Sequence, residues 1–240
     1  MARIATSARL DSPRRESTVI PRAFLRDEAY ASIRDYLLGD HDDQNLSERT
    51  LATSLGLGLG PLRSALERLR AEGLIAVTPN SGLRLPEITA REIIDFYEMR
   101  MAVECHIANQ LAGRLSSEQS DRLEDILTGQ ERAAETRDTV RYHHLDLDFH
   151  TSLTGFHGNL EMVRALGQLR DKMYRLSRRL HRTHPERLAV NAAQHRSIVE
   201  AIRSGDAREA WARMDTHLVW GRAFTLDPDG RLGGSTMPSN

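Results

Sequence analysis

The spacing of apolar residues along the chain predicts a mainly α-helical protein. Over most of the 240 residues, apolar positions recur three and four residues apart, which places them on one face of a helix. The first third of the chain has three short segments of this kind, at 22–38, at 47–55 and from Pro61 to Gly73. Beyond residue 88 come six longer segments, at about 89–115, 117–135, 138–154, 159–182, 185–204 and 206–225.

A stretch of different pattern separates the two groups of helices. The sequence LIAVTPNSGLRLP at 74–86 predicts two short strands joined by a turn at 79–82. Three helices followed by a two-stranded ribbon make a winged helix-turn-helix, which we place at 21–86. The six later helices have short connections, and we therefore expect an antiparallel helical bundle over 89–226.

The glycine-rich stretch GLGLGP at 56–61 raises the question of whether the chain binds a nucleotide. A phosphate-binding P-loop needs a lysine after its last glycine, and the single lysine of this sequence is far away, at position 172. A dinucleotide-binding loop follows a strand, whereas both flanks here have a helical pattern. We therefore expect the glycines to form the tight turn between two helices.

Composition limits the location and the partners of the protein. The formal net charge is −1 and there is one cysteine, Cys105, so no internal disulfide forms and a reducing compartment is suitable. The chain has neither the apolar region of a secretory signal nor an apolar run of about 18 residues. We expect a cytoplasmic protein that does not enter a membrane. The polar segments 1–20 and 227–240 are expected to be a disordered arm and a disordered tail.

Residues 46–75, LSERTLATSLGLGLGPLRSALERLRAEGLI, resemble the DNA-binding domain of the GntR family of bacterial transcription regulators. The resemblance implies that a homodimer binds a pseudo-palindromic operator in double-stranded DNA. Arg49 and Arg63 match family positions that contact DNA, and arginine pairs well with guanine edges and phosphates. On the pattern alone, both arginines could equally be solvated surface residues.

The predicted wing and the start of the third helix are less certain guides to DNA contact. Wing residues that could reach a phosphate or the minor groove are Asn80, Ser81, Gly82 and Arg84, and the alternative is an ordinary hairpin turn. The chain has Gly58-Leu59-Gly60 where the family has Ser-Arg-Thr. Leucine cannot pair with a guanine edge or a phosphate. We therefore expect weaker DNA binding or an unusual operator, and an interaction module with degenerate DNA recognition is the alternative.

The predicted bundle contains a second group of candidate residues. Asp146 and His150 are four residues apart and share a helix face, and His195 and His217 lie on two later helices. Imidazole and carboxylate groups suit zinc, nickel, iron or manganese. The chain has ten histidines, however, so spacing alone does not select these residues.

A resemblance to the GntR branch with an all-helical effector domain, the FCD or FadR-like branch, does select them. The shared motifs are D-L-D-F-H at 146–150, Gly158-Asn159, the segment 195–206 and the segment 214–218. The resemblance implies that a divalent metal is bound by Asp146, His150, His195 and His217, and a metal-free polar pocket is the alternative. Gln194 replaces the usual glutamate, and we expect this change to matter little.

The same resemblance implies a small organic acid as effector. The segment FYEMRMAVE at 96–104 matches the branch, and Arg100 could bind the carboxylate of the effector; the alternative is a buried ion pair between Arg100 and Glu104. A metal-dependent enzyme is less consistent with the sequence, because no H-E-x-x-H motif and no nucleophile elbow occur. We expect a repressor whose DNA affinity is controlled by the effector.

Overall fold

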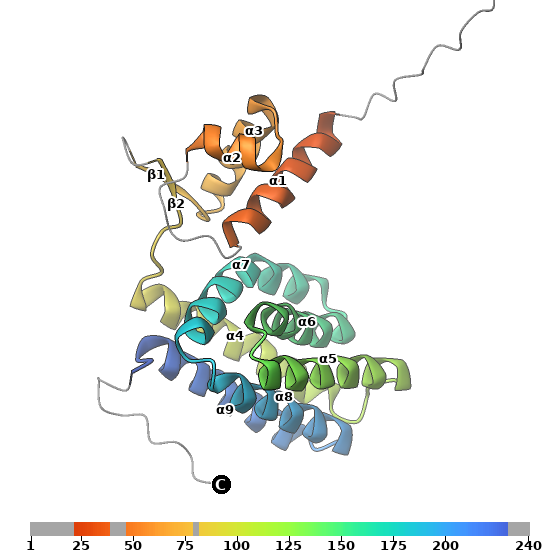
Figure 1. Ribbon diagram of the computed structural model, residues 1–240. Helices are drawn as coiled ribbons and strands as arrows, with labels where there is room; N and C mark the ends of the chain where they lie inside the picture. The colour runs from red at the N-terminus through yellow and green to blue at the C-terminus, as the bar shows by residue number, and fades with distance from the viewer. Residues whose placement is uncertain (1–21, 39–46, 79–81, 230–240) are drawn as a thin grey trace, which may run out of the picture. The chain divides into compact units, whose positions relative to one another are not determined.

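The computed structural model describes residues 22–38, 47–78 and 82–229, and contacts divide the chain into two units, Met1–Pro86 and Glu87–Asn240 (Figure 1). Most of the described residues are helical, which confirms the prediction of a mainly α-helical protein. The predicted disordered arm at 1–20 lies outside the described residues, as does the predicted tail beyond residue 229. No helix in the described ranges combines the length and the apolar character that crossing a membrane requires.

The N-terminal unit is a winged helix-turn-helix. Its helices are α1 (Arg22–Leu38), α2 (Glu48–Leu55) and α3 (Leu59–Ala71), and its strands are β1 (Ala76–Thr78) and β2 (Gly82–Arg84). The two strands pair antiparallel, with Val77 opposite Leu83. Helix α1 packs against α3, and the core includes Ile33 of α1, Leu51 of α2 and Leu66 of α3.

The glycine-rich stretch forms the turn between α2 and α3. Gly56 ends α2 in the left-handed conformation, with φ of 63°, which glycine adopts without steric cost. Gly58 is the N-cap of α3, which begins at Leu59, two residues before the predicted start. Pro61 is therefore the third residue of the helix, where its missing N–H removes no intrahelical hydrogen bond.

The C-terminal unit consists of six helices among the described residues. Side-chain caps mark several of their starts: Thr89 with Glu92 and Ser116 with Gln119 form capping boxes, and Asp206 caps the last helix, whereas the helix that begins at Arg187 has no side-chain cap. The helices are α4 (Ala90–Leu111), α5 (Ser117–Thr136), α6 (Thr139–His157), α7 (Leu160–Thr183), α8 (Arg187–Ser204) and α9 (Ala207–Leu226).

Helix α6 is longer than the sequence predicted. The predicted helix ends near Thr154, before Gly155, but α6 continues to His157 and ends at Gly158, which is left-handed with φ of 80°. Gly155 is thus inside the helix, where a single glycine costs only about 1 kcal/mol relative to alanine.

The six helices form a closed ring. Helix α4 packs against α9, and the ring continues through α8, α5, α6 and α7 back to α4, which also contacts α6 and α8 across the interior (Figure 1). Apolar residues fill most of this interior, including Ile107, Leu123, Leu153, Ile198 and Met214. An unusual group of buried polar residues lies among them: Arg100, Glu104, Gln130, His143, Asp146, His150, Asn191, His195 and His217. Buried polar groups are normally hydrogen-bonded, so a cluster of this size inside the bundle indicates a candidate binding site.

Candidate metal and effector site

Three histidines from three helices meet inside the bundle. His150 of α6, His195 of α8 and His217 of α9 are buried, and one nitrogen of each lies within 4.8 Å of the others. The two Nε2 atoms of His195 and His217 are 3.3 Å apart. His195 is also stacked on the ring of Phe149, with 4.1 Å between ring centroids, which fixes the plane of its imidazole.

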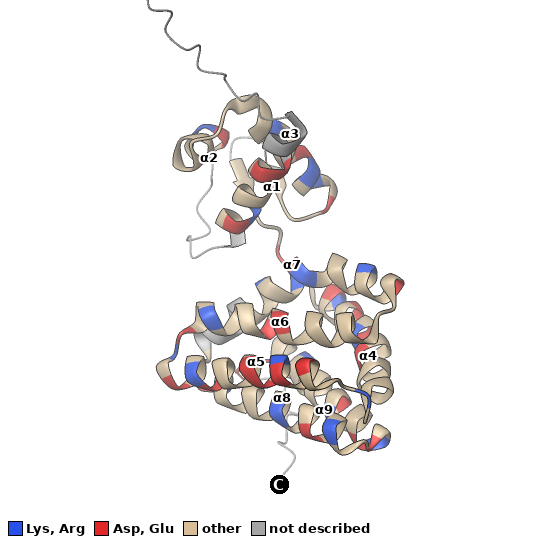
Figure 2. Ribbon diagram, turned by 90° about the vertical axis from the view of Figure 1, so that its right-hand side faces the viewer, with Lys and Arg blue, Asp and Glu red and all other residues tan. Residues whose placement is uncertain are grey.

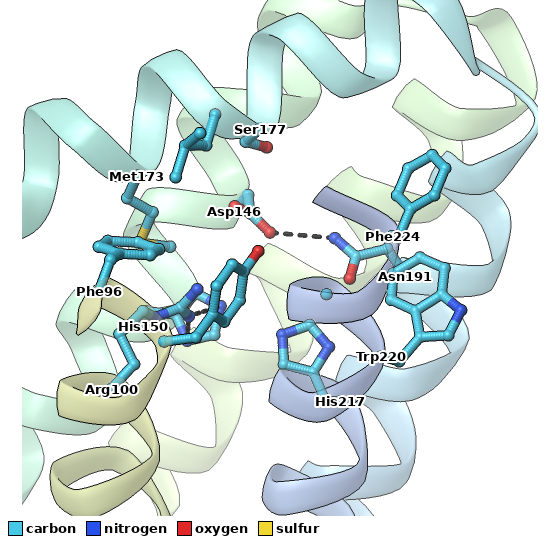
Figure 3. A pocket seen from close by; sticks show the side chains of 13 residues that line it. Phe96, Arg100, Asp146, His150, Met173, Ser177, Asn191, His217, Trp220 and Phe224 are labelled. Carbon is cyan, nitrogen blue, oxygen red and sulfur yellow. Dashed lines mark hydrogen bonds between the residues drawn. The ribbon is translucent and has the colours of Figure 1, made fainter. Parts of the chain in front are cut away.

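Asp146 lies beside the three histidines. Its Oδ1 is 3.7 Å from Nε2 of His195 and accepts a hydrogen bond of 3.2 Å from Nδ2 of Asn191. Figure 3 shows Asp146, His150 and His217 around the same pocket. The structure thus brings together all four residues that the sequence analysis selected as metal ligands.

Each of the three histidines has an oxygen partner at Nδ1. The Nδ1 atom of His195 lies 3.0 Å from Oε1 of Gln130, and that of His217 lies 3.0 Å from Oε1 of Gln194. The Nδ1 atom of His150 lies 2.5 Å from Oε2 of Glu104. A carboxylate only accepts hydrogen bonds and an amide oxygen does the same, so Nδ1 is the donor in each pair. The other ring nitrogen, Nε2, faces the neighbouring histidine in His195 and His217 and contacts Nη2 of Arg100 in His150.

The sequence analysis missed these partners. Gln194 was expected to matter little, but its amide touches His217. Glu104 was considered only as a partner of Arg100. Gln130 was not considered, although a glutamine on the apolar face of a predicted helix is a signal, because buried polar side chains usually have a specific partner.

Burial and neighbouring charges set the protonation of the site. Burial, with His150 and Arg100 nearby, holds the pKa of the His217 imidazole well below its ordinary value. Burial alone would raise the pKa of Glu104, but the adjacent Arg100 and His150 hold it below the usual range. Near neutral pH, the His217 imidazole is therefore uncharged and Glu104 is ionised.

Arg100 forms the buried ion pair with Glu104 that the sequence offered as the alternative to effector binding. Its Nε donates to Oε1 of Glu104 at 2.5 Å. Its Nη2 lies 3.0 Å from Nε2 of His150, and its Nη1 makes no hydrogen bond within the described part of the chain. Arg100 also lines a pocket, so this side chain is available to a bound group.

The pocket lies directly beside the histidines (Figure 3). The cavity volume is about 40 Å³, which is room for about three water-sized groups. Its polar lining consists of Arg100, Asp146, His150, Ser177, Asn191 and His217, and its other walls are Phe96, Tyr97, Met173, Leu176, Trp220, Gly221 and Phe224.

Three of the predicted DNA-contacting residues are exposed on the N-terminal unit. Arg49 and Arg84 are exposed, and the side chain of Arg63 is 65% exposed while its Nε donates to Glu48 at 3.0 Å. Leu59 is 51% exposed at the first position of α3. Gly82 begins β2, whereas Asn80 and Ser81 lie outside the described residues.

Figure 2 shows that basic and acidic residues are interspersed over the helices of the C-terminal unit. Many of them form exposed ion pairs, such as the pairs of Glu124 with Arg196 at 3.0 Å and with Arg203 at 2.8 Å. Pairs of this kind contribute little to stability. Because positive and negative side chains alternate over these helices, the surface of the C-terminal unit lacks the continuous positive charge of an anion-binding face.

Comparisons with known proteins agree for both units. The description "Bacterial regulatory proteins, gntR family" matches residues 25–85, and "FCD domain" matches residues 95–219. An HTH-type transcriptional regulator in an unstable DNA locus of Streptomyces ambofaciens is 34% identical over 177 residues, which cover 72% of each chain. The HTH-type transcriptional repressor GlaR of Escherichia coli is 27% identical over 189 residues, or 74% of this chain and 84% of that protein.

Solved structures have the same fold. The structure of E. coli McbR/YncC superimposes with a TM-score of 0.74 over 85% of this chain and 98% of its own, at 17% identity. A GntR transcriptional regulator from Rhodococcus sp. RHA1 gives a TM-score of 0.68, with coverages of 85% and 94% and 21% identity. At these identities the likeness shows the fold alone. With the family matches and the S. ambofaciens relative, the fold and the exposed winged helix establish that the chain belongs to the GntR family of bacterial transcription regulators, with an FCD domain as its C-terminal unit.

Proposed function

We propose that the protein is a homodimeric repressor whose affinity for its operator depends on a small carboxylic acid bound beside a divalent metal in the helical bundle. The observation that carries this proposal is the meeting of His150, His195 and His217 with Asp146 in a buried site. The relative named as a repressor, GlaR, supports the direction of regulation.

The donor set fits a metal ion. Two neutral imidazoles whose Nε2 lone pairs face each other at 3.3 Å repel unless a cation or a proton lies between them. Nitrogen ligands of tetrahedral zinc lie about 2.0–2.1 Å from the ion, and hence about 3.3–3.4 Å from each other. Oxygen partners at Nδ1 are the usual means by which a protein orients such ligands. Zinc, nickel, iron and manganese all accept imidazole and carboxylate ligands.

The site also contains groups that can bind the carboxylate of an acid. When bound, the metal supplies a positive charge that can hold a carboxylate oxygen. A metal held at Nε2 of His150 would take the place of Nη2 of Arg100 at that atom. Nη2 would keep its contact with Oε2 of Glu104 at 3.4 Å, so Nη1 and the second N–H of Nη2 would be the groups that donate to an acid. A carboxylate can then form a two-pronged pair with the guanidinium. The ion pair with Glu104 through Nε holds Arg100 in place meanwhile.

Regulation follows from linkage between the two units. A dimer presents two recognition helices to half-sites about one helical turn apart, and we assign DNA contact to Arg49, Arg63, Gly82 and Arg84, together with Asn80 and Ser81. The acid changes DNA affinity only as far as it binds better to one arrangement of the dimer than to another.

Metal analysis of a double variant tests the metal site. The protein with H195A and H217A together should be purified without its metal, while the wild type carries about one ion per chain by mass spectrometry. His144 is exposed and lies outside the cluster, so H144A serves as the control and should retain the ion. Equal metal content in the double variant and the wild type would eliminate the site.

A further inference from the structure

On the basis of the proposed function, we infer that the effector is a compact monocarboxylic acid with an apolar body, rather than a hydroxylated acid or a dicarboxylate. The pocket wall beyond the metal ligands determines this choice.

Two apolar walls face each other across the pocket. Figure 3 shows Phe96 and Met173 on one side and Trp220 and Phe224 on the other. The rings of Trp220 and Phe224 are stacked, with 5.6 Å between centroids and an angle of 23°. Phe96 and Met173 are buried. A group held between these walls is removed from water on two sides, which favours an apolar one.

The polar groups of the wall already have partners in the protein. Oγ of Ser177 lies 3.0 Å from Nδ1 of His143, and Nδ2 of Asn191 donates to Asp146 at 3.2 Å. The hydroxyl of Tyr97 lies 3.0 Å from Oγ1 of Thr225. A ligand hydroxyl held between the two apolar walls, away from these groups, would remain unpaired, and an unpaired buried polar group is costly.

Charge limits the ligand to one carboxylate. Among the described residues that line the pocket, Arg100 is the only arginine or lysine, and the metal ligands lie at the same end. A second carboxylate would lie against apolar side chains or close to Asp146, where its charge has no partner. The cavity volume of about 40 Å³ further favours a short body.

Matched acids test this inference on the full-length, metal-loaded protein. Butyrate, 3-hydroxybutyrate and succinate have the same number of carbons and differ in one hydroxyl or one carboxylate. Isothermal titration should show that butyrate binds about tenfold or more tightly than either of the others, because their extra polar group is left unpaired. Propionate should exceed lactate, its 2-hydroxy counterpart, in the same way.

A variant of the wall provides a second test. Trp220 is half-buried. W220Q replaces an indole, whose one polar group is an N–H donor, by an amide that is both donor and acceptor, so the preference for butyrate over 3-hydroxybutyrate should fall at least threefold. Trp211 lies on the same helix, is 45% exposed and does not line this pocket; W211Q should leave the preference unchanged.

The possible failures are distinguishable. Equal or tighter binding of 3-hydroxybutyrate or succinate to the wild type overturns the apolar monocarboxylate and leaves the acid-binding regulator in place. A preference that is unaffected by W220Q overturns the role of this wall. If the metal-loaded protein binds none of the five acids, both the inference and the proposed class of effector are wrong.

Discussion

At the scale of single residues, the side chains behind the metal ligands are the most informative part of the site. Glu104, Gln130 and Gln194 each face the Nδ1 atom of a different histidine. Two of the three partners are neutral amides, so the ligand set carries less negative charge than one oriented by three carboxylates. If the site holds the proposed metal, the affinity for that metal depends on these amides as well as on the ligands.

Removing the amide at position 194 should weaken metal binding. In Q194A, Nδ1 of His217 loses its acceptor and the imidazole is free to rotate, so metal affinity should fall by about 10- to 100-fold. Q194E restores an acceptor and adds a negative charge, and should bind metal at least as tightly as the wild type. Competition with a chromogenic chelator measures both values. The exposed Gln168 supplies the control, Q168A, and a Q194A protein with wild-type affinity would contradict the role of the amide.

The exposed arginine of the recognition helix should contribute to operator binding. R63A should weaken binding by about 1–3 kcal/mol, measured by fluorescence anisotropy on a sequence selected from random DNA. Arg213 of α9 is similarly exposed and paired with a glutamate, at 2.6 Å, so R213A is the matched control. L59R introduces the side chain that relatives have at this position and should strengthen binding. An unchanged affinity in R63A would place the DNA contact on another face.

At the scale of elements, caps explain why several helices begin where the sequence predicted. The pair Thr89 and Glu92 was recognised as a capping box from the sequence, and both of its hydrogen bonds are present. Six longer helices were expected after residue 88, and α4 to α9 correspond to them. The differences lie at helix ends: α3 begins two residues before Pro61, α6 continues past Gly155, α4 ends at Leu111 rather than near residue 115, and α8 begins at Arg187 rather than at 185. Proline is accepted in the first turn of a helix and a single glycine inside a helix costs little, so neither residue fixes a helix end by itself.

The capping box of α4 should make stability depend on pH. Hydrogen bonds from the backbone and side chain of Thr89, with Lys172 nearby, lower the pKa of Glu92 in the folded protein. A lowered folded-state pKa means that the ionised form stabilises the fold above the unfolded pKa of about 4.3. This contribution is lost as pH falls through the folded-state value.

The E92Q variant isolates this contribution. Its free energy of unfolding in urea should be below that of the wild type at pH 7, and the difference should shrink as the pH approaches 4. Glu118 of α5 is in the first turn of its helix without being its capping partner, so E118Q is the control. A difference between E92Q and the wild type that is constant from pH 7 to pH 4 would show that the charge of Glu92 has no role.

The site could be predicted from the sequence only in part, for a physical reason. The four candidate ligands lie 4 to 45 residues from their neighbours in sequence, and no periodicity connects α6, α8 and α9; the family motif selected them. The orienting residues Gln130 and Gln194, and the walls formed by Trp220 and Phe224, depend on how the helices pack. Packing of this kind is a tertiary property that spacing along one helix does not report.

At the scale of the whole molecule, the coupling between the pocket and the DNA should be reciprocal. If the acid lowers the affinity of the metal-loaded dimer for its operator by a given factor, DNA must lower the affinity for the acid by the same factor, which is about 5- to 150-fold in typical allosteric proteins. Anisotropy with and without acid gives the first factor, and titration of acid into free and DNA-bound dimer gives the second. Unequal factors would indicate a further state, such as dissociation of the dimer.

Helix α9 has a consequence of its own for exchange of the ion with solution. His217, Trp220 and Phe224 occupy successive turns of this one helix. The side chain that would bind the ion and the side chains that would enclose the acid are therefore carried by one rigid element and would move together. An acid bound against this helix would restrain the imidazole of His217. The ion would then dissociate only after the acid had dissociated. The concentration of the acid in the cell would thereby set the rate at which the protein exchanges its metal with solution.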